Sequence, residues 1–585
     1  MNTVQFASKF LENADSKAKG KAYTLADSVK AEKIEPPVTV MPWHHPNPFV
    51  SLKMQDKAAY KEHLLDHLAA LDIESPTSPV LLSKIICTIG KSTCNSPTIE
   101  KMIKNGMSVA RIDMSHGSLL DNIDLLRETR TFIIEYCSKN KIVYPIAIAV
   151  DIKGPEILTG VLYKAEKVTL VEGDTITLTT HPSWEERGSQ AKIFVDYKDL
   201  AQIVQPLDVI LLDYGRVKLS VRGTVDSDIV CDIVAGGEIH SYSDVMVLDV
   251  PLSMPFLTQK DKKDLEALVG ESVDVVFISG AIGKNSVELV REFLRQDNMK
   301  GECIMIVSKI ESKLALSRYD EILAASDGII INRGKLGIEL STEKVMQAQK
   351  AMIAKATKAG KPIFSVCEYL NSMIHKNCPT FAEAADVVAT IHDGVDGIIL
   401  KDETAIGEYP DVVVRTLNTL CKEAESLIWQ QEVWSSLNMA ATPPVDPSHA
   451  IAIAAVEASM KSHAAAIVVV TTSGTSAKLI ARYRPRCPVL AVSRYGAVVR
   501  QMNLYKCIVP VHYVAGPHKN WHVDVDLRLQ YAINLGKIEK YIKPGDPLIL
   551  VSGWRQGAGF TNNIRVVYAS ADEPWVLPFS PVVIA

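Results

Sequence analysis

The chain has 585 residues, which is too long for one hydrophobic core and predicts three or four domains. Its composition is 47% hydrophobic and 22% charged, with a net charge of -5, which is ordinary for a globular protein and lacks the basic signature of nucleic-acid binding. No apolar run reaches the length of a membrane span, so we expect no membrane partner. The 10 cysteines lack zinc or redox-motif spacing, which favours free thiols and a cytoplasmic location.

The N-terminal region divides into two parts by composition. Residues 1–55 are polar and end in a segment rich in Pro and His, so we expect a mobile N-terminal extension. Residues 56–80 carry leucines at helical spacing and predict an N-terminal helical segment that ends at Pro76. The leucines that carry this pattern are Leu64, Leu65, Leu68 and Leu71.

A repeating pattern of short β-rich runs and helical segments begins at Lys84. The runs include "KIICTIG", "SVARIDMS", "PIAIAVDIKG", "VDVVFISG", "CIMIVSKIE", "DGIIINRG", "KPIFSVCE" and "DGIILKDET". One helix between them has Ser341 or Thr342 as its N-cap and Gly360 as its stop. About eight βα units predict a TIM (β/α)8 barrel, which we place at residues 81–154 and 257–428.

Two further domains are expected around and after this barrel. Turn-rich β segments at 155–256 predict an inserted all-β lid domain after the third barrel strand. Strands such as "AAIVVVTTSG" and "PLILVSGW" within 429–570 predict a C-terminal doubly wound α/β domain. The apolar, Pro-rich residues 571–585 are expected to form a C-terminal extension. The fold class is therefore α/β.

Charged side chains follow the predicted barrel strands, where such barrels carry their active sites. They indicate an anionic substrate, one with a phosphate, with or without a metal. Each residue alone could be a solvated loop charge, but the whole set favours a site. The set is Arg111, Asp113, Ser115, His116, Asp151, Lys153, Lys309, Glu311, Arg333, Lys335, Cys367, Glu368, Lys401, Asp402 and Glu403.

Two loops of the C-terminal domain are candidates for a second anion site. "TTSGTS", from Thr471 to Ser476, lies between a predicted strand and helix, where hydroxyls and backbone N–H groups can hold a phosphate. "SGWRQGAGFTN", from Ser552 to Asn562, adds glycines and Arg555. Both loops could equally be ordinary turns and helix caps.

Many of these segments together closely resemble the pyruvate kinase family. They include "GMSVARIDMSHG", "AIAVDIKGPEILTG", "SDGIIINRGKLGIEL", "ETAIGEYP" and "GWRQGAGFTN", and they extend from about Tyr60 to Ala569 in the family's order. The resemblance implies phosphoryl transfer from phosphoenolpyruvate to ADP, giving pyruvate and ATP in glycolysis. It also implies Mg2+ and K+ as cofactors, a homotetramer, and an effector-binding C-terminal domain.

The resemblance assigns roles to residues at the barrel mouth. Arg111 would hold the substrate phosphate, Lys309 would stabilise the phosphoryl group in flight, and the Gly334 N–H would bind the substrate carboxylate. Glu311 would ligate magnesium.

Further roles concern potassium, the nucleotide and the effector. Ser115 and Asp151 would face the potassium ion, and His116 would face ADP or ATP. A sugar bisphosphate effector would bind at Thr471, Ser473, Gly474, Ser476, Trp521, Arg528, Arg555, Gly557 and Gly559.

The chain departs from the family pattern at the same rim. The family has "ARGDLG" where this chain has "NRGKLG", so Lys335 stands in place of an Asp that shares the magnesium ion. An ammonium has no lone pair for a metal, and at about 4 Å it would repel each unit of metal charge by about 4 kcal/mol at an effective dielectric of about 20. Other departures are Asp113 for Asn, Leu158 for Arg, Cys367 for Thr, Glu368 for Gln and Lys401 for Ser.

These departures leave three hypotheses for the function. The chain is an ordinary pyruvate kinase, a pseudoenzyme that acts as a structural or binding partner in a pyruvate-kinase-like oligomer, or a changed enzyme in which Lys335 replaces magnesium as the charge partner of Glu311. We favour impaired or lost pyruvate kinase activity. We also expect a direct ion pair between Lys335 and Glu311.

Overall fold

The computed structural model contains one compact unit that begins at Leu52. The residues that it describes are 55–140, 142–164, 167–213, 215–248, 255–296, 303–555, 557 and 559–570. The expected extensions at residues 1–55 and 571–585 therefore lie outside the described residues, apart from Gln55. Among the described residues, no helix is both long enough and apolar enough to cross a membrane.

The segment before the barrel contains two short helices, α2 (Asp56–Ala59) and α3 (Leu64–Ala69), where the leucine spacing suggested one helix. The side chain that packs inward is His67, which is fully buried and hydrogen-bonds through its two ring nitrogens to the carbonyl oxygens of Ala58 and Leu427. Leu65 is 78% exposed. A buried histidine, not a leucine stripe, therefore anchors this segment.

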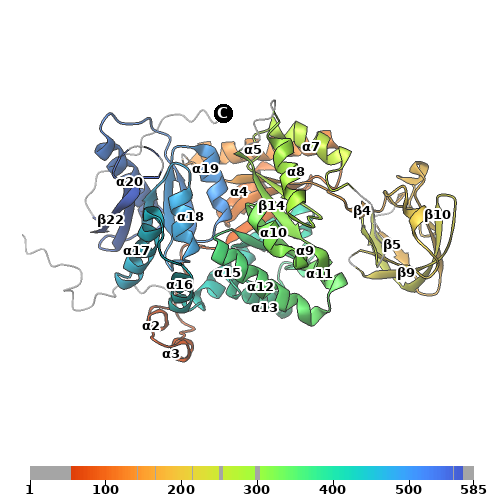
Figure 1. The fold of residues 1–585 in the computed structure, drawn as a ribbon, viewed down its shortest axis with the longest axis horizontal. Coiled ribbons are helices and arrows are strands. Elements are labelled where there is room, and N and C mark those ends of the chain that lie inside the picture. The colour runs from red at the N-terminus through yellow and green to blue at the C-terminus, as the bar shows by residue number, and fades with distance from the viewer. Residues whose placement is uncertain are drawn as a thin grey trace, which may run out of the picture. The chain divides into compact units, whose positions relative to one another are not determined.

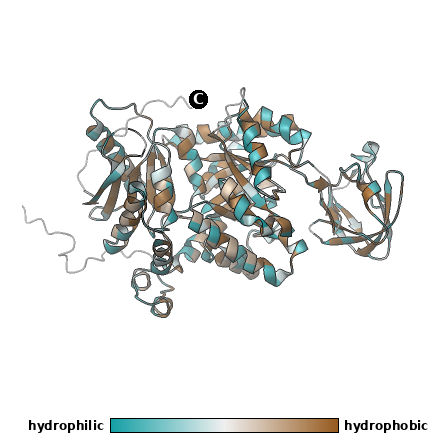
Figure 2. Cartoon of the chain, viewed as in Figure 1, coloured by the Kyte–Doolittle hydropathy of each residue, from teal (hydrophilic) through white to brown (hydrophobic). Residues whose placement is uncertain are grey.

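Eight parallel strands close into the predicted barrel, in the order β1-β17-β16-β15-β14-β13-β3-β2. Their side chains are almost all buried, because helices cover the outer face while the inner face fills the barrel, and Figure 2 shows the strands as mainly hydrophobic. The strands are β1 (Lys84–Thr88), β2 (Met107–Asp113), β3 (Ala147–Asp151), β13 (Val275–Ile278), β14 (Met305–Ile310), β15 (Gly328–Asn332), β16 (Ile363–Val366) and β17 (Gly397–Leu400).

Helices surround these strands (Figure 1). They are α4 (Ser96–Lys104), α5 (Leu119–Asn140), α7 (Gln259–Val269), α8 (Lys284–Leu294), α9 (Lys313–Ser317), α10 (Tyr319–Ala325), α11 (Arg333–Glu339), α12 (Thr342–Ala359), the 3-10 turn η4 (Asn371–Ile374), α13 (Phe381–His392), α14 (Asp402–Ala405) and α15 (Pro410–Ser426). Helix α12 begins after Ser341 and ends at Gly360, which has φ 71°, as the sequence predicts. Helix α11 directly follows β15, and Asn332 caps it by accepting a hydrogen bond from the Lys335 N–H at 3.3 Å.

The insert between β3 and β13 consists mainly of β-strands, as expected, with one short helix and one 3-10 turn among its described residues. We call this insert the lid. Its main sheet has the order β4-β12-β8-β9-β10-β6-β7, and β11 pairs with β5. Its elements are β4 (Ile157–Leu158), β5 (Lys167–Leu170), β6 (Thr175–Thr179), η2 (Pro182–Trp184), β7 (Lys192–Phe194), α6 (Leu200–Ile203), β8 (Val209–Leu212), β9 (Val217–Val225), β10 (Asp228–Ala235), β11 (Gly237–His240) and β12 (Asp244–Val247).

The C-terminal domain has a five-stranded sheet in the order β20-β19-β18-β21-β22. Four strands are parallel, and β22 runs antiparallel along β21, a strand that the sequence reading did not identify. The elements are α16 (Gln430–Met439), α17 (Pro447–Lys461), β18 (Ala466–Val470), α18 (Thr475–Arg482), β19 (Val489–Ser493), α19 (Gly496–Gln501), η5 (Met502–Leu504), β20 (Ile508–His512), α20 (Trp521–Ile538), β21 (Pro547–Gly553) and β22 (Thr561–Tyr568).

Candidate active site at the mouth of the barrel

Arg111 is held by two carboxylates at the end of β2. Its Nε donates to Asp151 at 2.8 Å, its Nη2 donates to Asp113 at 2.7 Å, and its Nη1 donates to Thr88 at 2.7 Å. Strand register explains the arrangement, because Asp113 of β2 lies opposite Asp151 of β3. Burial opposes ionisation of Asp113, but Arg111 and nearby cations outweigh it and hold the pKa of that carboxyl far below its usual range.

Lys309 lies near the end of β14 and completes this network. Its ammonium is 2.7 Å from Asp151 and donates to Ser279 Oγ at 3.0 Å. Burial favours the neutral amine, but the carboxylates of Asp151, Glu311 and Glu156 outweigh it and raise the pKa of Lys309. Lys309 therefore stays charged, as stabilisation of a transferring phosphoryl group requires.

Glu311 follows β14 and is nearly buried. One carboxylate oxygen accepts the Gly280 N–H at 2.8 Å, and the other accepts the Asn332 side-chain amide at 2.8 Å. Burial opposes the charge, but Lys335, Lys309 and these two hydrogen bonds lower the pKa of Glu311. The carboxylate is therefore ionised and already hydrogen-bonded on both oxygens.

Lys335 has carboxylate partners that the sequence reasoning missed. Its ammonium lies 2.8 Å from Glu156 and 3.4 Å from Asp244, at the base of the lid. We expected an ion pair between Lys335 and Glu311. Lys335 is close enough to lower the pKa of Glu311, but it forms its ion pairs with Glu156 and Asp244 of the lid. Asp244 stands in "SYSDVMVLD", at the start of β12, and no local pattern of the sequence pairs it with Lys335.

The remaining predicted residues lie around this cluster. Ser115 donates its backbone N–H to Asp113 at 2.9 Å, and the His116 ring lies 5.7 Å from the ring of Tyr242 in the lid. Gly334 lies in the first turn of α11. Cys367 is half-buried after β16. Two other departures are buried Leu158, whose N–H donates to Asp196 at 2.9 Å, and Lys401, whose N–H donates to Glu403 at 2.7 Å.

The side chains around Glu311 do not fit a magnesium ion held by two protein carboxylates. Both oxygens of Glu311 accept hydrogen bonds, and the second position that the resemblance implies carries the ammonium of Lys335. Within the described residues, no group of three or more His, Cys, Asp or Glu side chains is arranged to hold a metal ion. Ser115 follows β2 and donates its N–H to Asp113, which lies opposite Asp151 of β3; the potassium role of Ser115 and Asp151 stays a prediction.

In the C-terminal domain, hydroxyls of the first candidate loop form hydrogen bonds within the protein. Thr471 Oγ1 accepts the Gly474 N–H at 3.0 Å, and Ser473 contacts Thr475 at 2.9 Å. Ser476 contacts Thr561 at 2.6 Å, which joins the start of α18 to the end of the second candidate loop.

The predicted effector arginines lie among aromatic rings. Arg528 lies 5.1 Å from the Trp521 ring centroid and 2.8 Å from the Asp524 carboxylate. The guanidinium of Arg555 lies 3.8 Å from the Phe560 ring centroid. In the same loop, Gly557 and Gly559 have φ 120° and 83°, backbone conformations that favour glycine.

Comparison with known proteins identifies the family. Residues 81–414 match the family model described as "Pyruvate kinase, barrel domain", and residues 449–567 match "Pyruvate kinase, alpha/beta domain". The chain belongs to the pyruvate kinase family. It is 38% identical over 520 residues to Pyruvate kinase PKLR of Homo sapiens, covering 88% of this chain and 90% of that protein.

Other pyruvate kinases match over a similar length. Identity is 34% over 508 residues to Pyruvate kinase 1 of Trypanosoma brucei brucei, with 86% of this chain and 99% of that protein covered. It is 33% over 511 residues to Pyruvate kinase of Candida albicans, with 86% and 99% covered. These relatives, all named pyruvate kinases, support a pyruvate-kinase-like function for this chain.

Proposed function

We propose that this protein is a pyruvate-kinase-like phosphotransferase whose turnover with phosphoenolpyruvate and ADP is strongly reduced. One observation carries the proposal: the ammonium of Lys335 stands at the position of a family magnesium ligand and lies 2.8 Å from Glu156. An unpaired cation about 4 Å from a metal site costs about 4 kcal/mol per unit of metal charge at an effective dielectric of about 20, and Glu156 and Asp244 offset part of this cost for Lys335. A remaining cost of about 4 kcal/mol for the divalent ion is about a thousandfold in rate.

The roles that we propose for the mouth residues follow the family pattern. Arg111 and Lys309 act on the phosphate, the Gly334 N–H binds the substrate carboxylate, and His116 faces the nucleotide. Ser115 and Asp151 hold potassium. Glu311 is the one remaining magnesium ligand of the family pair.

A pseudoenzyme is the second candidate function, and Arg111 favours it. Its guanidinium is occupied by Asp113 and Asp151, so a substrate phosphate has to compete with two internal carboxylates. In this reading the protein keeps the pocket and the assembly of the family but performs little phosphoryl transfer.

A coupled assay of pyruvate formation tests the two candidates. The purified full-length protein is assayed with and without Mg2+, beside the Lys335→Asp variant. We expect wild-type turnover at least about a thousandfold below the typical 1–100 per second of kinases. Lys335→Asp should recover only part of the loss, because Asp113, Cys367, Lys401 and Leu158 remain. Ordinary magnesium-dependent turnover of the wild type would overturn the proposal.

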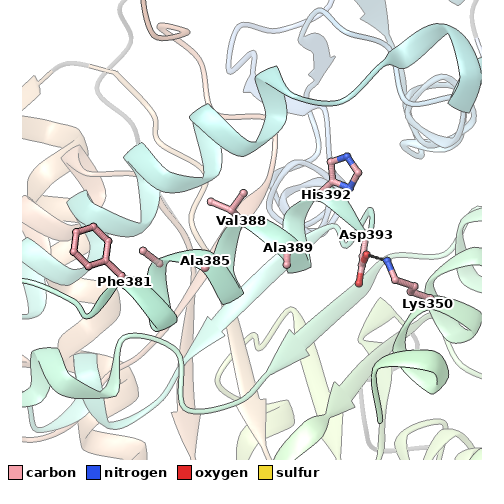
Figure 3. Close-up of a pocket in the computed structure, with 8 residues that line it drawn as sticks. Lys350, Phe381, Ala385, Val388, Ala389, His392 and Asp393 are labelled. Carbon is pink, nitrogen blue, oxygen red and sulfur yellow. Dashed lines mark hydrogen bonds and ion pairs between the residues drawn. The ribbon is translucent and has the colours of Figure 1, made fainter. Parts of the chain in front are cut away.

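We also propose a homotetrameric assembly that uses helix α13. A cavity of about 550 Å3 lies along this helix, and Phe381 at its first residue is 98% exposed (Figure 3). The cavity is lined by Lys350, Phe381, Ala384, Ala385, Val388, Ala389, His392 and Asp393. A protruding ring and an apolar groove on one helix suit a two-fold interface, because each copy can place its ring in the groove of the other.

Two further proposals concern regulation and location. A sugar bisphosphate effector would bind between the Thr471–Ser476 loop and the Arg555 loop, supported by their junction through Ser476 and Thr561. The protein would work in the cytoplasm, supported by its 10 cysteines, which form no disulfide among the described residues.

A further inference from the structure

The base of the lid brings two acidic side chains together. Strands β4 and β12 pair in antiparallel fashion, with Leu158 opposite Asp244 and Ile157 opposite Val245. Glu156 immediately precedes β4, at the point where the chain leaves the barrel. Glu156 stands two residues before Leu158, the partner of Asp244, so the two acidic residues are diagonal neighbours on this strand pair at the base of the lid.

Lys335 reaches these two carboxylates from the barrel. It belongs to α11, and its ammonium lies 2.8 Å from Glu156 and 3.4 Å from Asp244. The three side chains are only 9%, 14% and 10% exposed, respectively. Two buried carboxylates without a cation would repel each other and lose their hydration, and one ammonium between them offsets part of this cost.

A second contact joins the lid to the barrel. Arg216, in the turn between β8 and β9, lies 2.6 Å from Glu368 of the barrel and 3.1 Å from Asp213 of its own turn. Arg216 and Glu368 are each about half exposed, so this pair contributes at most about 1 kcal/mol. The cluster around Lys335 is the buried one of these two connections.

We propose that Lys335 is a built-in cation that ties the base of the lid to the barrel through Glu156 and Asp244. In this arrangement a side chain of the protein supplies the positive charge between barrel and lid, and the tie needs no divalent ion. The same lysine explains why the residues do not fit magnesium: Lys335 stands at the position of the second ligand, and its ammonium pairs with Glu156 and Asp244 of the lid. The inference rests on the geometry of the lid base and does not depend on the level of turnover.

Hydrogen exchange of the full-length protein, measured without substrate, tests the tie. In Lys335→Met, which removes the charge, the amides of residues 155–162 and 240–247 should exchange at least about tenfold faster than in the wild type. Lys335→Arg keeps the charge and should retain most of the protection. Lys344→Met changes an exposed lysine of the neighbouring helix α12 and should leave both segments unchanged. Amides of strand β1 provide the internal reference for global stability.

A magnesium titration separates the tie from the catalytic proposal. Exchange at the lid base of the wild type should not respond to Mg2+, whereas Lys335→Asp should exchange faster and regain part of its protection with Mg2+. Equal exchange in the wild type and Lys335→Met would overturn the tie, as would wild-type protection that rises with Mg2+. If Lys335→Met fails to fold, Asp244→Asn serves instead, because it removes the charge of one of the two partners. Amides of the lid base should then exchange about threefold faster than in the wild type. Unchanged exchange in Asp244→Asn would overturn the proposal.

Discussion

Asp113 lies 2.7 Å from the guanidinium of Arg111 and occupies one of its donor edges. Asp151 takes the other donor edge at 2.7–2.8 Å, so Arg111 faces two carboxylates inside the barrel mouth. A substrate phosphate is also an anion and competes for the same donors. The charge added by Asp113, where the family has Asn, therefore acts directly on the residue that we propose as the phosphate ligand.

Replacement of Asp113 by Asn should strengthen anion binding. The amide keeps the shape of the side chain but removes its charge, so Arg111 becomes available to a phosphate. We expect affinity for phosphoenolpyruvate to rise about tenfold, which corresponds to about 1.4 kcal/mol. Thermal shift over a range of ligand concentrations measures it, since a ligand that binds the folded state raises Tm.

The matched control for this variant is Asp121→Asn. Asp121 also pairs with a cation, Lys91 at 3.3 Å, but this pair lies on the surface of the barrel and is half exposed or more. The control should bind phosphoenolpyruvate as the wild type does. If Asp113→Asn has the same affinity as the control, Asp113 is not the competitor of the substrate.

The sequence predicted the architecture well because its signals are local. Alternating apolar runs and helical segments identified the barrel, and capping residues such as Gly360 fixed the end of α12. Strand ends also indicated which residues line the mouth. Residue spacing could not predict the contacts between the lid and the barrel. The main example is the contact of Lys335 with Glu156 and Asp244. These residues are far apart in the sequence, and no local pattern pairs one with another.

Arg484 and Asp396 should be essential for stability. Both nitrogens of the Arg484 fork lie 2.8 Å from the Asp396 carboxylate, and this buried pair joins the C-terminal domain to the barrel. Asp396 also accepts the N–H groups of Lys506 and Ile363. Arg484→Met would leave a buried carboxylate without its cation, which costs about 3–5 kcal/mol. Thermal unfolding should show a clearly lower Tm.

Lys461→Met is the control for the loss of a positive charge. Lys461 pairs with Glu457 at 4.0 Å on the surface of α17 and is 76% exposed, so its removal should change stability by less than about 1 kcal/mol. Equal Tm values for Arg484→Met and Lys461→Met would mean that the buried pair does not stabilise the junction between the domains.

Glu403 should make the protein less stable as pH rises. Burial raises the pKa of this carboxyl to about 8, well above the value of about 4.3 in an unfolded chain. Between these two values the folded state binds the proton that the unfolded state has released. Stability from this group therefore falls by up to about 1.4 kcal/mol per pH unit across the window and levels off above pH 8.

The variant Glu403→Gln tests this dependence, because glutamine resembles the protonated acid. The Tm of the variant relative to the wild type should rise steadily from pH 5 to pH 8. Glu408→Gln changes an exposed carboxylate nearby and serves as the control. A constant difference between Glu403→Gln and the wild type over this range would show that Glu403 ionises normally.

Helix α13 should determine the oligomeric state. Phe381 is 98% exposed and stands beside a groove of about 550 Å3, an arrangement that buries apolar surface only when a second copy covers it. Phe381→Glu places a charge in this interface, where it would lose its hydration without a partner. Sedimentation equilibrium at micromolar concentration should show a shift from the tetramer to smaller species. Leu207→Glu, at an 83% exposed position in the lid, should assemble as the wild type does. If Phe381→Glu remains tetrameric, the assembly uses another surface.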